Sequence, residues 1–246
     1  MDLRLYLFVF LFLFNISGIY AQSDTMTILK KKKWYQRNSV KYFAAPAILV
    51  GYGVSVSGNR GLYSSLDAKK DIHHLFPDFS TDADDYLKYV PYGQYVLLKL
   101  LGTSSQHDFL NVALLIIKSN IIASAMVFPL KNIVGRERPD RSDFMSFPSG
   151  HTADAFVAAA ILHQEFKYIS PWIGVSGYAV AATVGVCRML NNKHWQSDVL
   201  VGAGIGILSV HLAYLTHLNR FHLPKKLTIS PMVSFRTKGI GISYRF

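Results

Sequence analysis

Residues 199–215 read VLVGAGIGILSVHLAYL, and this apolar stretch rich in small residues decides the fold class. It is much longer than an ordinary β-strand and rich in Ala, Leu and Ile, so it predicts a helix. Stretches of the same kind occur at about residues 42–56, 89–101, 109–130, 152–166 and 172–187. The sequence therefore predicts an all-α fold, a six-helix bundle that is either embedded in a membrane or rests on one.

The composition limits the classes of partner. Half of the 246 residues are hydrophobic and 17% are charged, which excludes a disordered or mucin-like chain. The 26 Lys and Arg against 15 Asp and Glu give a net charge of +11, which indicates an anionic partner: nucleic acid, an anionic membrane face or a phosphorylated substrate. The single cysteine, Cys187, excludes an intramolecular disulfide framework and a Cys-rich zinc site.

The amino terminus indicates export or membrane insertion. Residues 1–21 carry an early Arg, an apolar run and a small residue before a polar break, which is typical of a secretory signal peptide or of an uncleaved N-terminal anchor. Export argues against nucleic acid as the partner. Residues 22–40 form a basic juxtamembrane segment, in which Lys30 to Lys33 suit an anionic lipid surface or a solvated charge run.

Two segments outside the predicted helices have a different pattern. Residues 221–246 follow the helical domain, residues 41–220, and alternate apolar and polar positions on both sides of a turn at 237–239, which predicts a short C-terminal β-hairpin. Residues 58–85 are polar and rich in turn residues. Their adjacent histidines, 73 and 74, and their acids at 82–85 are interpreted as ordinary surface residues, because neighbours in sequence do not share a helix face.

Three polar clusters stand at predicted helix ends and carry chemistry suited to a phosphate. Arginine forks match phosphate oxygens bidentately, and a lysine adds a point charge. A serine that caps a helix before a glycine lets backbone amides and the helix dipole meet an anion. Of two histidines, one can attack phosphorus while the other protonates the leaving alkoxide, and His194 and Asp198 are spaced i and i+4 so that the carboxylate can orient the imidazole.

The clusters resemble the three motifs of the type 2 phosphatidic acid phosphatase superfamily. Lys-x6-Arg-Pro matches residues 131–139, Pro-Ser-Gly-His matches 148–151, and Arg-x5-His-x3-Asp matches 188–198. The resemblance implies that His194 is the nucleophile, that Asp198 orients it, and that His151 is the general acid and then the base. It also implies that the phosphate oxygens are held by Lys131, Arg138, Ser149, Gly150 and Arg188. Neither a metal nor another cofactor is expected.

One position departs from the family pattern. The serine that precedes the third-motif arginine is Cys187 here. If that hydroxyl contacts phosphate, the thiol is a weaker donor and binding is reduced; if the position packs against the bundle, either small residue serves.

The function that the resemblance implies is hydrolysis of a membrane lipid phosphate, such as the phosphate of lipid A, another envelope glycolipid or a phospholipid. We expect a bacterial envelope protein with its active site facing the periplasm and no obligate protein partner. Three alternatives remain open: a soluble, non-specific periplasmic acid phosphatase, a vanadium haloperoxidase, and a non-catalytic envelope protein that binds phosphorylated glycolipid.

Overall fold

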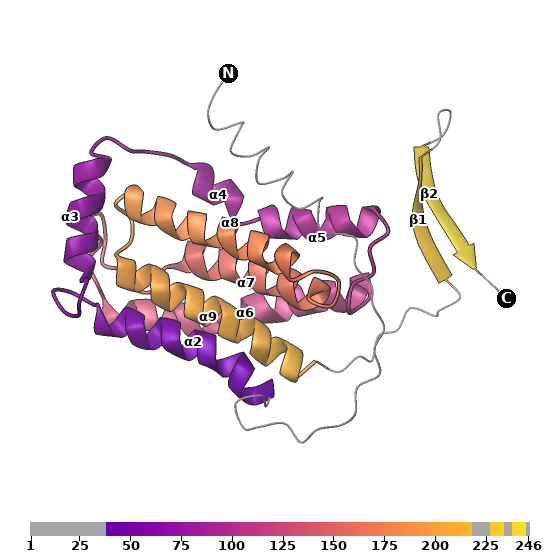
Figure 1. The fold of residues 1–246 in the computed structure, drawn as a ribbon, viewed down its shortest axis with the longest axis horizontal. Helices are drawn as coiled ribbons and strands as arrows, with labels where there is room; N and C mark the ends of the chain where they lie inside the picture. Colours follow the sequence, from indigo (N-terminus) through magenta and orange to yellow (C-terminus); the bar gives the residue numbers. More distant parts are fainter. Residues whose placement is uncertain (1–37, 218–226, 234–237, 245–246) are drawn as a thin grey trace.

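The computed structural model describes residues 38–217, 227–233 and 238–244 (Figure 1). Each of the six predicted helical stretches forms a helix, although the bounds differ by a few residues. They are α2 (Asn38–Ser55), α5 (Val90–Leu100), α6 (Phe109–Val134), α7 (Gly150–Phe166), α8 (Pro171–Leu190) and α9 (Gln196–Leu215). The predicted leader and the basic segment at Lys30 to Lys33 lie outside the described residues.

The expectation of only six helices is wrong, because the polar segment before α5 contains α3 (Ser65–Leu75) and α4 (Ala83–Leu87). Helix α3 begins with a capping box: the Ser64 hydroxyl accepts the Asp67 amide at 3.2 Å, and the Asp67 carboxylate accepts the Ser64 amide at 2.9 Å. Only Ser65 and Ala68 of this helix are buried, so α3 has no apolar stripe for a sequence pattern to reveal.

Helix α7 forms the centre of the bundle, where it packs against α5, α6, α8 and α9 (Figure 1). Its alanines, among them Ala155, Ala158 and Ala159, are fully buried and let neighbouring helices approach closely. A β-carbon on Gly202 of α9 would lie 2.5 Å from the Ser149 carbonyl oxygen. Glycine at this position therefore allows the start of α9 to reach the start of α7.

Helices α6, α8 and α9 are long and apolar enough to cross a membrane. Helix α6 has a mean hydropathy of 1.9 and exposes large apolar side chains along its outer face, including Ile117, Ile121 and Phe128. An exposed apolar face of this length suits lipid rather than water. These three helices give the bundle the character of a membrane protein.

Near the carboxyl terminus, β1 (Leu227–Val233) pairs antiparallel with β2 (Lys238–Tyr244). Leu227 lies opposite Tyr244, and Val233 lies opposite Lys238. Lys238 and Gly239, which the sequence pattern assigns to a turn, are therefore strand residues. The connection at residues 234–237 lies outside the described residues.

Candidate active site

The predicted site residues gather at one end of the bundle. The end of α8, the starts of α7 and α9, and the loop after α6 meet there, and α3 crosses this end of the bundle (Figure 1). Two backbone contacts join the parts: the Ser149 amide donates to the Asp198 carbonyl at 3.0 Å, and the His194 amide donates to the Arg188 carbonyl at 3.2 Å. Residues from the second and third motifs are thus fixed to one another by the main chain.

His194 is held in one tautomer. Its side chain is buried, with 3% of the residue exposed, and its Nδ1 lies 2.7 Å from the carbonyl oxygen of Ser146. A carbonyl oxygen only accepts, so Nδ1 carries the proton and donates it. The Nε2 atom is therefore unprotonated, and its lone pair faces Nη1 of Arg138 across a long contact of 3.5 Å. This is the nitrogen that can attack phosphorus.

The surroundings of His194 keep it neutral near pH 7. Burial, together with the positive charges of Arg138 and Lys131, lowers the pKa of His194 to about 4, while Asp198 opposes this shift. Arg138 and Lys131 both belong to the first motif. A neutral imidazole with a free Nε2 lone pair is the form that a nucleophile requires.

Asp198 does not hold the imidazole directly. Its Oδ2 lies 3.7 Å from Nδ1 of His194, beyond hydrogen-bond distance. The same oxygen instead accepts the Ser146 hydroxyl and the Trp195 amide, the latter at 2.9 Å. Because Ser146 also supplies the carbonyl that binds His194, the orienting contact predicted from the i, i+4 spacing runs through Ser146.

Arg136 is a site residue that the motif analysis missed. Its Nη1 lies 3.0 Å from Oδ1 of Asp198 and also donates to the Ser197 hydroxyl. Its guanidinium stands 5.1 Å from the centre of the Trp195 ring. The Asp198 carboxylate is fully buried, and Arg136 supplies the charge that balances it. An arginine between two motif positions gives no signal of this role in the sequence.

Lys131 and Arg138 do not share a helix face, because Lys131 lies in the last turn of α6 and Arg138 lies in the loop that follows it. Helix α6 ends at Val134, and Gly135 caps it with a positive φ of 52°. Lys131 Nζ donates to the Met145 carbonyl at 2.6 Å. Arg138 pairs with Asp143 at 2.7 Å through Nε and donates to the Lys193 carbonyl at 3.2 Å. The loop of residues 135–149 is thus bound to the end of α6 through Lys131 and to the segment before α9 through Arg138.

Arg188 and His151 both bind acids of α4. Arg188 Nη1 lies 2.7 Å from Oδ2 of Asp84, and His151 Nε2 lies 2.7 Å from Oδ1 of Asp85. Asp84 is 1% exposed, so the interpretation of this acid pair as ordinary surface residues is wrong for Asp84 and misses the role of Asp85. The partners are 104 and 66 residues apart, a separation that no local pattern records.

The charges on His151 and Arg188 are coupled. Burial lowers the pKa of His151, and the charges of Arg188 and Lys88 lower it further, whereas Asp85 raises it. Arg188 also keeps a free donor, because its buried Nε has no hydrogen-bond partner among the residues that the structure describes. An unused buried donor beside a histidine favours an anionic ligand.

Ser149 is the N-cap of α7, as predicted. Its hydroxyl is fully buried, accepts the Thr152 amide at 3.4 Å and lies 2.9 Å from the Thr152 hydroxyl. The side chain is therefore committed to the cap. At Gly150, a β-carbon would meet only the Val127 side chain, at 4.0 Å. The packing of the described residues therefore does not require glycine at this position.

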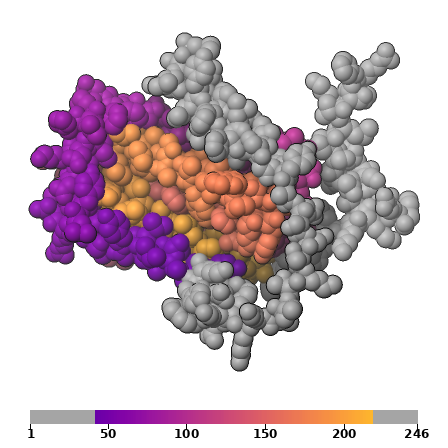
Figure 2. Space-filling view, viewed as in Figure 1, coloured from indigo at the N-terminus to yellow at the C-terminus, as the bar shows by residue number. Residues whose placement is uncertain are grey.

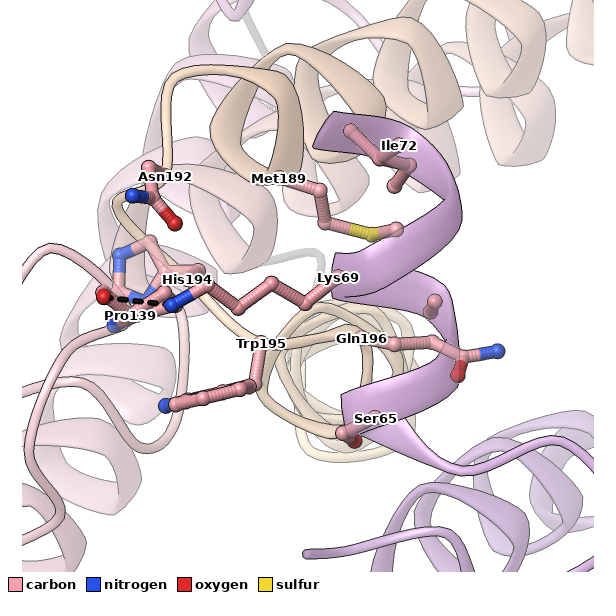
Figure 3. A pocket seen from close by; sticks show the side chains of 10 residues that line it. Ser65, Lys69, Ile72, Pro139, Met189, Asn192, His194, Trp195 and Gln196 are labelled. Atoms are coloured by element: carbon pink, nitrogen blue, oxygen red, sulfur yellow. Dashed lines mark hydrogen bonds between the residues drawn. The ribbon is translucent and has the colours of Figure 1, made fainter. Parts of the chain in front are cut away.

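Helix α3 lies against one side of the loop that carries His194. Lys69 extends from α3 along Trp195, 5.2 Å from its ring centre, and donates to the Pro139 carbonyl at 2.8 Å (Figure 3). His194 also lines the cavity left beneath, which has a volume of about 10 Å³. That is room for about one water molecule, so a phosphate group must bind on the other side of His194.

Cys187 is buried, with 8% of the residue exposed, and no hydrogen bond to its thiol is found within residues 38–217. Its place in α8 favours packing over contact with phosphate.

Parts of the chain resemble known proteins. Residues 110–222 match the PAP2 superfamily. A lipid A 1-phosphatase of Porphyromonas gingivalis is 48% identical over 93 residues, which are 38% of this chain and 21% of that protein. A lipid A 1-phosphatase of Rhizobium johnstonii is 29% identical over 130 residues, or 46% of this chain and 51% of that protein. The chain thus spans between about a fifth and a half of these curated relatives.

Two solved structures are also similar. LpxE from Aquifex aeolicus is 25% identical, with a TM-score of 0.43 over 59% of this chain and 93% of that chain. A transmembrane PAP2-type phosphatidylglycerolphosphate phosphatase from Bacillus subtilis is 20% identical, with a TM-score of 0.37 over 90% of this chain and all of that one.

Proposed function

We propose that this chain, whose residues 110–222 match the PAP2 superfamily, hydrolyses a phosphate ester of a membrane lipid through a phosphohistidine intermediate. The observation that carries the proposal is the His194 tautomer: Nδ1 donates to the Ser146 carbonyl, which leaves Nε2 unprotonated. The lone pair of Nε2 has one long contact, 3.5 Å from Nη1 of Arg138, which is weak enough for attack on phosphorus to displace it.

The proposed reaction has two steps. In the first, His194 Nε2 attacks phosphorus, the bond from phosphorus to the ester oxygen breaks, and His151 gives its proton to the departing alkoxide. In the second, His151 accepts a proton from water, the resulting hydroxide attacks phosphorus, and the phosphorus–nitrogen bond breaks. Arg138, Arg188 and Lys131 balance the charge that develops on the phosphate oxygens.

The cations are arranged for this role. Arg138 and Arg188 each have a carboxylate partner, Asp143 and Asp84, but a guanidinium has five donors and can bind an anion as well. The unpartnered Nε of Arg188 is one such donor among the described residues. The backbone at Gly150, at the N-terminus of α7, adds amides and the positive end of a helix dipole.

The proposed substrate is a phosphorylated lipid of the cell envelope, with lipid A as the first candidate. The 48% identity to a protein named lipid A 1-phosphatase supports this choice, although it extends over only 38% of the chain. The apolar outer face of α6 supports a substrate that arrives within a bilayer. We further propose that the end of the bundle that carries His194 faces the periplasm.

Phosphate release by the purified full chain in detergent tests the proposal. The substrates are lipid A, phosphatidic acid, phosphatidylglycerophosphate, undecaprenyl pyrophosphate and the water-soluble p-nitrophenyl phosphate. We expect hydrolysis of at least one lipid, no activity in His194→Ala, and full activity in His74→Ala, which removes an exposed histidine. Mass spectrometry of acid-sensitive phosphate on the quenched enzyme should place it on His194.

Other outcomes identify the alternatives. Preferential hydrolysis of p-nitrophenyl phosphate would indicate a non-specific acid phosphatase. Halide oxidation in the presence of vanadate would indicate a haloperoxidase. Lipid A binding without any release of phosphate would indicate a binding protein.

A further inference from the structure

A second polar site lies at the opposite end of the bundle from His194. A groove of about 870 Å³ opens between α2, α7, α8 and α9. In the space-filling view, α9 is visible between α2 below and α8 above (Figure 2). The volume falls within the range of small-molecule binding sites. Neither the motifs nor the proposed reaction uses this groove.

The groove is distant from the proposed active site along α7. Its polar residues His163, Gln164 and Lys167 come from the last turns of that helix and its C-cap, whereas His151 stands in the first turn. Lys167 follows His151 by 16 residues, which corresponds to roughly 24 Å at the helical rise of 1.5 Å per residue. A ligand in the groove therefore does not share the phosphate pocket.

The positive charge of Lys167 has no balancing carboxylate. Its Nζ donates to Oε1 of Gln164 at 2.6 Å, and within residues 38–217 it forms no ion pair. The neighbouring carboxylate of Glu165 is committed elsewhere: it accepts from His107 at 2.8 Å and from the Tyr214 hydroxyl at 2.6 Å. The groove thus holds a cation that no carboxylate balances within the described residues, and its ammonium stands 5.1 Å from the centre of the Tyr168 ring.

His211 offers a hydrogen-bond donor at the same end of the groove as Lys167. His211 is 8% exposed, and its Nδ1 lies 3.4 Å from Nε2 of Gln164. Because the lysine fixes the amide oxygen of Gln164, its nitrogen faces His211 and donates, so Nδ1 accepts and the proton of the ring sits on Nε2. No group in the described part of the chain accepts that Nε2 proton. The ring of His163 also lines the groove, but its buried Nδ1 lies against α8, where a β-carbon on Gly174 would come within 2.6 Å of it.

The remainder of the groove is lined by three tyrosines, Tyr42, Tyr168 and Tyr178, and by apolar side chains. Phe156, Ala182 and Ile207 line it on the side nearer the proposed active site. Phe156 precedes His163 by seven residues and Lys167 by eleven, or about 10 to 16 Å along α7. A cationic end joined to an apolar channel matches an amphiphile with an anionic head and a hydrocarbon chain, and the three apolar helices place the groove where such molecules are available.

We propose that this groove binds an anionic membrane lipid, with the headgroup phosphate at Lys167 and His211 and an acyl chain along Phe156 and Ile207. A phosphodiester lipid fits the role, because it offers an anionic phosphate without being a phosphomonoester that the proposed active site would hydrolyse. The bound lipid fills the groove between α2 and α8 and remains associated with the protein during turnover.

Native mass spectrometry of the full chain in detergent tests this site, with phosphatidylglycerol and phosphatidylcholine as probes. We expect phosphatidylglycerol to be retained and phosphatidylcholine not. Lys167→Gln and His211→Gln should each weaken phosphatidylglycerol binding about tenfold or more, as loss of a charged or buried contact to phosphate does. Lys167→Arg, which keeps the charge, should retain binding.

Two matched controls separate this groove from the rest of the molecule. Lys118→Gln removes another lysine, which donates to the Thr216 carbonyl outside the groove, and should leave binding unchanged. His194→Ala should also leave it unchanged. Unaltered lipid retention in both Lys167→Gln and His211→Gln, or equal retention of phosphatidylcholine, would overturn the proposal. Equal affinity for inorganic phosphate and phosphatidylglycerol would overturn the lipid assignment, because it would leave no role for the apolar channel.

Discussion

The carbonyl oxygen of Ser146 accepts the Nδ1 proton of His194 at 2.7 Å, and this single contact fixes the tautomer of the proposed nucleophile. The Ser146 hydroxyl in turn donates to Asp198. The carboxylate thus positions the residue that positions the imidazole. In a triad of direct contacts the carboxylate itself holds the ring; here its charge acts at 3.7 Å, and the hydrogen bond comes from the main chain.

Stability should fall as the pH falls from about 6.5 to 4. An unfolded histidine titrates near 6.5, whereas burial lowers the pKa of His194 in the fold to about 4. Between these values the unfolded chain binds one more proton than the folded chain, so lowering the pH favours unfolding. The full effect is about 3 kcal/mol and should be absent above pH 7.

Thermal unfolding in detergent at pH 7.5 and 4.5 measures this effect. His194→Gln should lose much of the difference between the two pH values, and His74→Gln, at an exposed histidine, should keep it. The assignment fails if wild type and His194→Gln destabilise equally on acidification.

Arg136→Ala should destabilise the protein and reduce kcat, although Arg136 is not one of the fixed residues of the first motif. Removing it leaves the fully buried Asp198 carboxylate without its charge partner, which costs about 3 to 5 kcal/mol for a buried pair. Arg136→Lys, which keeps the positive charge, should retain part of the stability and part of kcat. Thermal unfolding and steady-state kinetics report the two effects, with Arg60→Ala, at an exposed arginine, as the control. Wild-type stability in Arg136→Ala would show that the ion pair does not support Asp198.

Asp85→Asn should move the alkaline limb of the kcat profile to lower pH. The Asp85 carboxylate raises the pKa of His151 against burial and the charge of Arg188. Without it the histidine loses its proton at lower pH, and a general acid works only while protonated. Asp78→Asn removes an exposed acid elsewhere and should leave the profile unchanged. An unshifted limb in Asp85→Asn would rule out His151 as the acid that this limb reports.

Cys187→Ser should leave turnover and inhibition by phosphate within about twofold of wild type. The Cys187 thiol is buried in α8 and makes no hydrogen bond within residues 38–217, so a hydroxyl there gains no phosphate contact. Initial-rate kinetics with added phosphate provide the measurement. Tighter inhibition in Cys187→Ser would mean that position 187 faces the anion, as the family serine would.

The helices and the chemistry of the site could be predicted from the sequence because both are recorded locally. A stretch such as residues 199–215 is too long and too apolar to be anything but a helix in this chain, and each motif carries its own donors, histidine or carboxylate within a few residues. The N-cap at Ser149 follows from residues 149–152 alone.

The contacts between these local units depend on the tertiary structure. The capping box of Ser64 and Asp67 specifies where α3 begins, but nothing near it says that α3 and α4 fold over the site. The pairing of Asp84 with Arg188, the Ser146 carbonyl at His194, and the groove at Lys167 each depend on side chains or backbone brought together by packing. Local patterns encode the period and the ends of a helix. Contacts between distant residues arise only when whole helices pack, and small residues such as Gly202 set how closely those helices approach.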